Sequence, residues 1–149
     1  MKLLVSAIAL LIGSNVAAMA GDQALKFNLV TFYVGEKDGV SHSVGVTIAP
    51  DGTTLGTKDF TTKDGPDGKG TGHSTYNFQG GSVTADFVYG VDGNATGGKV
   101  QGTYKILSGT GEYLGATGTG SFSGKWGDMS PLKGAGLYNV ELDVRTPGS

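Results

Sequence analysis

Residues 136–144 read Gly-Leu-Tyr-Asn-Val-Glu-Leu-Asp-Val, and apolar and polar side chains alternate more clearly here than elsewhere in the chain. Successive side chains of a β-strand point to opposite faces, so the alternation predicts a strand with one buried face and one face in water. The buried face carries Tyr138, Val140, Leu142 and Val144. No stretch after residue 21 has apolar residues at the spacing of an amphipathic helix, which predicts an all-β fold.

Seven other stretches have the length and composition of strands, which brings the expected number to eight. They are residues 25–34, 41–48, 57–61, 72–78, 82–89, 99–107 and 118–125. Tight-turn sequences between them, at residues 50–52, 65–68, 80–81 and 92–94, favour antiparallel neighbours. Without helices to cover a sheet, the strands bury their apolar face by closing into a barrel or by folding as a sandwich. We expect one domain, residues 21–149, that forms an eight-stranded antiparallel β-barrel.

The composition excludes several classes of protein. Glycine fills 28 of 149 positions without a period of three, and 38% of the residues are hydrophobic, so neither collagen nor a disordered polar chain fits. Glycines within expected strands, such as Gly102 and Gly120, permit the sharp coiling that a small barrel needs. The net charge of -2 provides no basic surface for nucleic acid. The absence of cysteine excludes disulfides and thiolate ligands.

The first twenty residues have the pattern of a secretory signal peptide. Lys2 precedes an apolar run from Leu3 to Ile12, and Ala18-Met19-Ala20 forms a cleavage site. The run is shorter than the roughly 20 residues of a membrane span. We therefore expect export, removal of residues 1–20, and a secreted or periplasmic domain without a membrane span. An outer-membrane barrel is disfavoured because the expected strand at 57–61 is shorter than the roughly 9–11 residues of a spanning strand.

Residues 106–118 carry a resemblance to known proteins. They read Ile-Leu-Ser-Gly-Thr-Gly-Glu-Tyr-Leu-Gly-Ala-Thr-Gly, which resembles the Gly-Thr-Gly-x-[Phe/Tyr]-x-x-Ala-x-Gly segment of dirigent proteins and of the barrels like allene oxide cyclase. Residues 29–38 are similar to the first strand and acidic turn of that superfamily. In the motif, Gly109 and Gly111 permit positive φ and the aromatic residue fits under the turn. The resemblance implies a calycin-like barrel, often trimeric, whose lumen binds a hydrophobic small molecule and shapes its cyclisation or coupling without a cofactor.

Tyr33, Glu36 and Asp86 are candidates for catalysis. In the plant allene oxide cyclases that the chain resembles, a glutamate and an asparagine on the first strand act on the substrate. Tyr33 and Gly35 stand at the corresponding positions here, which argues against allene oxide cyclisation. Glu36 is the acidic residue nearest to the place of the dirigent aspartate. Asp86 lies between apolar neighbours, so an inward position would raise its pKa and suit acid-base chemistry, whereas an outward position would make it a surface charge.

Aromatic residues on the expected strands are candidates for a ligand pocket, and those that point inward would give apolar walls with phenol groups. They are Phe27, Tyr33, Phe87, Tyr104 and Tyr138. The alternative is a barrel filled by its own side chains. His42 and His73 are the only histidines, and they lack the spacing of a metal site, so we expect neither metal nor cofactor.

The sequence leaves the activity open between three functions. They are a cofactor-independent cyclase, isomerase or stereo-directing barrel, a carrier without turnover, and a structural surface protein with a filled core. The first expected strand bears apolar residues on both faces, including Val30, Phe32 and Val34 opposite the Phe27 face. An apolar outer face predicts a homo-oligomer, and the resemblance implies a trimer.

Overall fold

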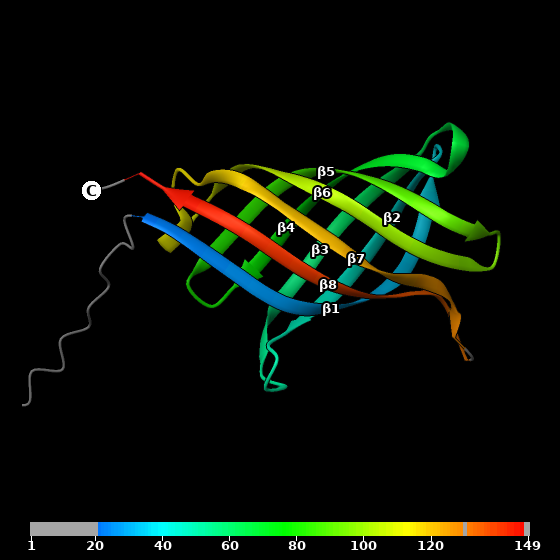
Figure 1. Cartoon of the computed structure of the whole chain (residues 1–149), viewed down its shortest axis with the longest axis horizontal. Helices are drawn as coiled ribbons and strands as arrows, with labels where there is room; N and C mark the ends of the chain where they lie inside the picture. The colour runs from blue at the N-terminus through cyan, green and yellow to red at the C-terminus, as the bar shows by residue number, and fades with distance from the viewer. Residues whose placement is uncertain (1–20, 130, 148–149) are drawn as a thin grey trace, which may run out of the picture.

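All eight strands predicted from the sequence are present in the computed structural model, which describes residues 21–129 and 131–147. They are β1 (Gly21–Lys37), β2 (Val40–Ile48), β3 (Thr54–Asp64), β4 (Lys69–Phe78), β5 (Gly81–Asn94), β6 (Gly97–Gly109), β7 (Thr117–Met129) and β8 (Leu132–Thr146). Each strand pairs antiparallel with the next, and β8 pairs with β1 to close the barrel (Figure 1). The predicted all-β, eight-stranded antiparallel barrel is confirmed. The predicted signal peptide, residues 1–20, lies outside the described residues.

The strands are longer than the alternating stretches suggested. β3 spans Thr54–Asp64 rather than residues 57–61, because its polar ends pair with β2 and β4 through the backbone, which needs no apolar side chains. The short length assigned to this strand was therefore wrong, and it no longer argues against a spanning strand. Within the described residues, no helix is long and apolar enough to cross a membrane.

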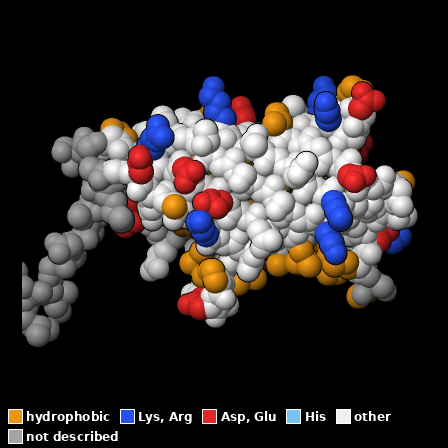
Figure 2. All heavy atoms as spheres, viewed as in Figure 1, with side chains coloured by type: hydrophobic (Ala, Val, Ile, Leu, Met, Phe, Trp, Pro, Cys, Tyr) orange, Lys and Arg blue, Asp and Glu red, His pale blue; other side chains and the backbone are white. Residues whose placement is uncertain are grey.

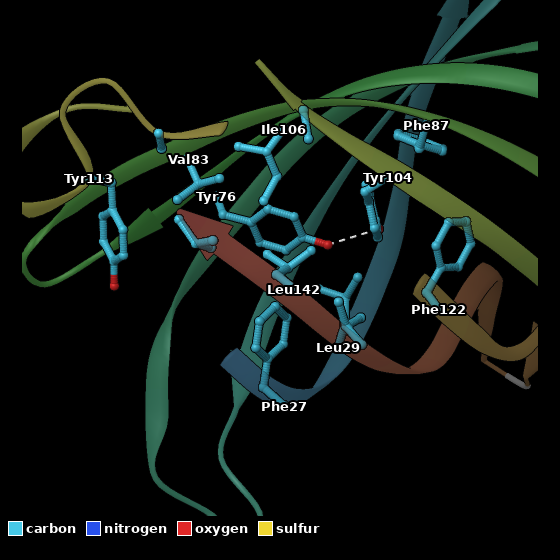
Figure 3. Close-up of a cluster of buried hydrophobic side chains, with 14 of the residues drawn as sticks. Phe27, Leu29, Tyr76, Val83, Phe87, Tyr104, Ile106, Tyr113, Phe122 and Leu142 are labelled. Carbon is cyan, nitrogen blue, oxygen red and sulfur yellow. Dashed lines mark hydrogen bonds between the residues drawn. The ribbon is translucent and has the colours of Figure 1, made fainter. Parts of the chain in front are cut away.

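The register sets which side chains face the lumen. On β8, residues Val140, Leu142 and Val144 are buried while Asn139 and Asp143 are exposed, as the alternation predicted. Phe27 and Leu29 of β1 pair beside this strand and are buried as well. Figure 3 shows the side chains of Phe27, Leu29 and Leu142 beside those of Tyr76 and Ile106 inside the barrel.

Glycines on neighbouring strands make room for the lumen's aromatic rings. A Cβ atom on Gly72 of β4 would lie 2.1 Å from Cζ of Phe87, and one on Gly102 of β6 would lie 2.4 Å from Cζ of Phe122. These separations are far below van der Waals contact, so each ring lies directly over a glycine of the adjacent strand. The strand glycines therefore accommodate large side chains in addition to permitting curvature.

The motif at residues 106–118 closes one end of the barrel. Two short 3-10 turns interrupt the strands, η1 (Pro66–Gly68) and η2 (Gly111–Tyr113), and the motif contains the second. Gly111 has a φ of +60°, as predicted, whereas Gly109 has no positive φ and instead packs against the backbone of Tyr113. The Tyr113 ring is buried under the turn, 5.8 Å from the ring of Phe78.

Candidate functional site: a chamber in the lumen

One half of the barrel is filled and the other half is hollow. Towards the end that carries the β2–β3, β4–β5 and β6–β7 connections, the rings of Phe27, Tyr76, Phe78 and Tyr113 pack at centroid distances of 5.4–5.9 Å. Towards the other end lies a cavity of about 740 Å³. Its mouth is formed by the β1–β2, β3–β4, β5–β6 and β7–β8 ends of the strands. The lumen therefore combines the filled core and the pocket that the sequence posed as alternatives.

Lys58 of β3 lies at the floor of this chamber. Its side chain is buried, and its Nζ donates a hydrogen bond to the hydroxyl of Tyr104 on β6 at 2.8 Å. The hydroxyl of Tyr76 donates to the same Tyr104 oxygen at 2.8 Å, the contact dashed in Figure 3. Tyr104 thus accepts two hydrogen bonds, and neither uses its own hydroxyl hydrogen.

Aromatic rings surround the Lys58 amine. Its Nζ lies 4.4 Å from the ring centroid of Phe60, 4.8 Å from Phe87, 4.9 Å from Tyr76 and 5.0 Å from Tyr104. Within residues 21–129 and 131–147, no carboxylate pairs with it. Burial lowers the pKa of Lys58 well below its ordinary value, since the charged form loses its hydration. The ring faces favour the ammonium form and act in the opposite direction.

Protonated phenols complete the polar part of the wall. Burial raises the pKa of Tyr138 to about 12, and a hydrogen bond with Thr31 acts in the other direction. Tyr89 donates its hydroxyl hydrogen to the carboxylate of Asp64. Burial is the largest cause that raises the pKa of Tyr89, and the Asp64 carboxylate raises it further. These phenols therefore stay protonated at neutral pH, and the hydrogen of Tyr138 can be donated to a ligand while that of Tyr89 is held by Asp64. The apolar wall consists of Leu29, Phe60, Val91, Val100, Phe122 and Trp126.

Most of the pocket residues proposed from the sequence lie at the chamber. Phe87, Tyr104 and Tyr138 line its interior, and Tyr33, with 48% of its surface exposed, lies at the mouth. Phe27 does not line the chamber, because it packs in the filled half of the lumen against Tyr76 and Phe78.

The two acidic candidates occupy different places. Glu36 lies at the mouth of the chamber, where Ser41 Oγ donates to its carboxylate at 3.5 Å. Asp86 points outward, with 58% of its side chain exposed and Oδ1 2.6 Å from Nδ1 of His73. The outward alternative, a surface charge, is the one that holds for Asp86.

Lys58 was not predicted as a site residue because a single lysine in a polar stretch is expected to face outward. One signal could have found it. Lys58 shares strand parity with Phe60 and Thr62, and all three point inward, whereas Asp59 points outward and accepts a hydrogen bond from His42 at 2.9 Å. Among the described residues, no group of three or more histidine and acidic side chains could hold a metal.

A second hollow lies on the outside of the barrel. It is larger, about 1320 Å³, but it is broadly open, and it extends over the outer faces of β1 and of β4 to β8. Many of its outward side chains are small and polar, including Asn28, Gln101, Ser121 and Ser123, and charged residues such as Lys26 and Glu141 also line it. The middle of the face in Figure 2 is mostly free of hydrophobic groups. Size alone favours this hollow, but enclosure and the buried amine favour the lumen chamber as the functional site.

The comparisons with known proteins support the fold alone. No family model and no curated protein matches the chain. Among solved structures, the chain is similar to the pterocarpan synthase dirigent protein GePTS1, with a TM-score of 0.56 and 14% sequence identity over 83% of this chain and 88% of that one. The chain therefore has a dirigent-like barrel fold.

Proposed function

We propose that the barrel binds a hydrophobic, ring-bearing small molecule in the lumen chamber and directs the stereochemical course of its cyclisation or coupling without a cofactor. The observation that carries the proposal is the half-hollow lumen, whose aromatic walls enclose a few polar groups at fixed positions. Such a chamber holds one conformer of a reactive molecule and keeps water away from it. The fold neighbour is named as a synthase and a dirigent protein, which supports this class of function.

A carrier without turnover is the second candidate. The acidic groups at the chamber, Glu36, Asp64 and Asp128, are exposed residues of the strand ends, while the interior holds phenols and one amine. A carrier needs only the apolar walls and the phenol donors. Within the described part of the chain, a reaction that needs an acid inside the chamber has only the tyrosines and Lys58 to supply it.

The binding proposal is tested by native mass spectrometry of the protein purified from its own host, with identification of any released molecule. Thr62 and Thr61 provide a matched pair, because Thr62 lines the chamber and Thr61 points outward between His42 and His73. We expect a hydrophobic molecule on the wild type and on Thr61→Trp, and none on Thr62→Trp, in which the indole occupies the mouth of the chamber. Equal binding to both variants would contradict the proposal.

We also propose that the protein assembles as a trimer through an apolar outer patch. The outer residues of β1 and β2 pair as Val30 with Val46 and Phe32 with Val44, and Leu137 of β8 lies beside Val30. Figure 2 shows hydrophobic side chains gathered along the edge where β1 and β2 lie in Figure 1. Contiguous exposed apolar surface of this kind marks interfaces.

Sedimentation velocity tests the assembly. We expect Val44→Lys to yield monomers, because it places a charge in the centre of the patch. The control Thr103→Lys lies on the polar outer face and should remain assembled. A monomeric wild type would contradict the proposed trimer.

The export proposal has a separate test, which is the N-terminal sequence of the protein recovered from the periplasm or medium. We expect it to begin at Gly21. An intact Met1 on the recovered protein would contradict cleavage after Ala20.

A further inference from the structure

We propose that Lys58 is a reactive lumen amine that condenses with the carbonyl group of an aromatic aldehyde or ketone to form an imine. This inference rests on the proposed function, since it requires that the chamber admit the ligand. It adds the chemical class of the ligand and a covalent step, neither of which the fold implies.

The position of Lys58 supports a role for its amine. The chain places its most buried basic group at the floor of an open chamber rather than on the surface, and gives it no carboxylate partner among the described residues. A buried lysine without a counterion is costly, and an apolar side chain such as methionine would fill the same space without that cost. A lysine retained there has a use for its nitrogen.

The surroundings of the Lys58 nitrogen are largely apolar. The centroids of four rings, those of Phe60, Tyr76, Phe87 and Tyr104, lie 4.4–5.0 Å from Nζ, and the residue is almost completely buried. Desolvation in an apolar pocket shifts lysine towards the neutral amine, which is the nucleophilic form, and here it acts against the preference of the ring faces for the ammonium form. The rings of Phe60 and Phe87 also offer an apolar surface to an aromatic ligand beside the amine.

The hydroxyl of Tyr104 lies beside the amine and keeps a hydrogen that it can donate. Because it accepts from both Lys58 and Tyr76, its own hydrogen is available to a ligand oxygen next to the amine. Burial raises the pKa of Tyr104, so this hydrogen is present at neutral pH. The pair thus presents a nucleophile and a hydrogen-bond donor to the two ends of a carbonyl group.

The condensation balances without any oxidant or reductant. The Nζ lone pair forms a bond to the carbonyl carbon, the C=O π bond breaks, and the oxygen receives a proton through Tyr104 while Nζ releases one. The nitrogen lone pair then forms the C=N bond as the C–O bond breaks. Both Nζ hydrogens leave with the oxygen as one molecule of water.

The test uses 2-naphthaldehyde as the probe, sodium borohydride to trap the imine, and peptide mapping to locate the modified lysine. Binding is followed separately through the fluorescence of Trp126, the only tryptophan of the chain, which lines the chamber. Two analogues without the aldehyde accompany it: 2-naphthalenemethanol and 2-naphthoate. We expect quenching by the aldehyde and the alcohol, and one naphthylmethyl group on Lys58 while exposed lysines such as Lys26 stay largely unmodified.

Three results would overturn the inference. Quenching by the aldehyde with modification of surface lysines alone would leave the proposed function intact and remove the imine. Much tighter binding of 2-naphthoate than of the alcohol, without trapping, would show that Lys58 is an ammonium that holds a carboxylate. Absence of quenching by all three probes, together with absence of trapping, would show that the chamber does not bind aromatic molecules of this size. That result would contradict both the imine and the proposed binding of such ligands in the chamber.

Two variants distinguish a loss of amine reactivity from a loss of the folded structure. Lys58→Met should abolish trapping at this position while circular dichroism shows an intact barrel. Tyr104→Phe keeps the amine and the ring, and we expect it to slow trapping by at least about tenfold, because the hydroxyl donor is lost. The trapping rate at Lys58 should level off at a lower pH than the rates at exposed lysines, and a shared pH profile would contradict the inference.

Discussion

The Nζ of Lys58 and the hydroxyl of Tyr104 form a 2.8 Å hydrogen bond across the lumen between β3 and β6, two strands that are not neighbours in the sheet. With Tyr76, whose hydroxyl also donates to Tyr104, this bond forms a polar layer between the filled and the hollow half of the barrel. The layer fixes the floor of the chamber. It also gives the barrel a buried titratable group whose charge state affects stability.

Lys58→Met should make the stability less dependent on pH. The pKa of Lys58 is lowered in the fold from 10.5, so between the lowered value and 10.5 the unfolded chain binds more protons than the folded one. Stability of the wild type therefore rises with pH in that window and is lower below it. At neutral pH we expect the variant to be more stable, on the order of the 1–4 kcal/mol seen when buried charges are replaced by apolar groups.

The measurement is urea unfolding of both proteins from about pH 6 to about pH 9. This range stays below the ionisation of the tyrosines, whose pKa values are raised in the fold and whose stabilising effect is lost only at higher pH. Parallel stability curves for the two proteins would show that Lys58 keeps an ordinary pKa.

Thr47→Val should stabilise the barrel. Thr47 is completely buried on β2, and its hydroxyl has no hydrogen-bond partner among residues 21–129 and 131–147. A buried unsatisfied hydroxyl costs about 1–3 kcal/mol, and valine has nearly the same shape. The matched control is Thr31→Val, which removes the partner of Tyr138 and should destabilise the fold. Thermal unfolding of both variants checks the opposite signs, and destabilisation by Thr47→Val would mean that its hydroxyl is satisfied in solution.

Gly72→Ala should destabilise the barrel by about 1–3 kcal/mol, because the new methyl group collides with the ring of Phe87. Gly90→Ala is the control, since nothing lies within 4 Å of a Cβ atom at that position. For Gly90→Ala we expect no loss of stability. We expect a gain of up to about 1 kcal/mol, because alanine reduces the conformational freedom of the unfolded chain. Denaturant unfolding compares the two, and equal effects would contradict the packing of Phe87 over Gly72.

Asp86→Asn should leave ligand binding unchanged. The carboxylate lies on the outer face and pairs with His73, and an exposed pair of this kind contributes at most about 1 kcal/mol. The readouts are Trp126 fluorescence with 2-naphthalenemethanol and a thermal melt. A binding defect in a folded Asp86→Asn protein would mean that the outer face takes part in ligand binding.

The sequence was sufficient to predict the fold because backbone pairing follows the alternation. Residues such as Val140 and Leu142 alternate with exposed neighbours, and the turn glycines restrict how the strands connect. The strand ends were missed because pairing extends β3 beyond Thr57 and Thr61, where the side chains carry no alternation.

The site was predicted less completely. Phe87, Tyr104 and Tyr138 were placed in a pocket from their strand positions, and the structure places them at the chamber. The division of the lumen into two halves depends on which rings meet across the barrel, as Phe27 meets Phe78, and this follows from three-dimensional packing rather than from local pattern. Lys58 can be recognised as a residue of the lumen only when the inward face of β3 is known.

A crystal structure of the protein purified from its own host would test the central claim most directly. We expect electron density for a ring-bearing molecule between Lys58 and Trp126, in the half of the lumen away from Phe78. An empty lumen with Trp126 and Phe122 collapsed onto Lys58, or a ligand bound only in the outer hollow beside Ser121, would contradict it.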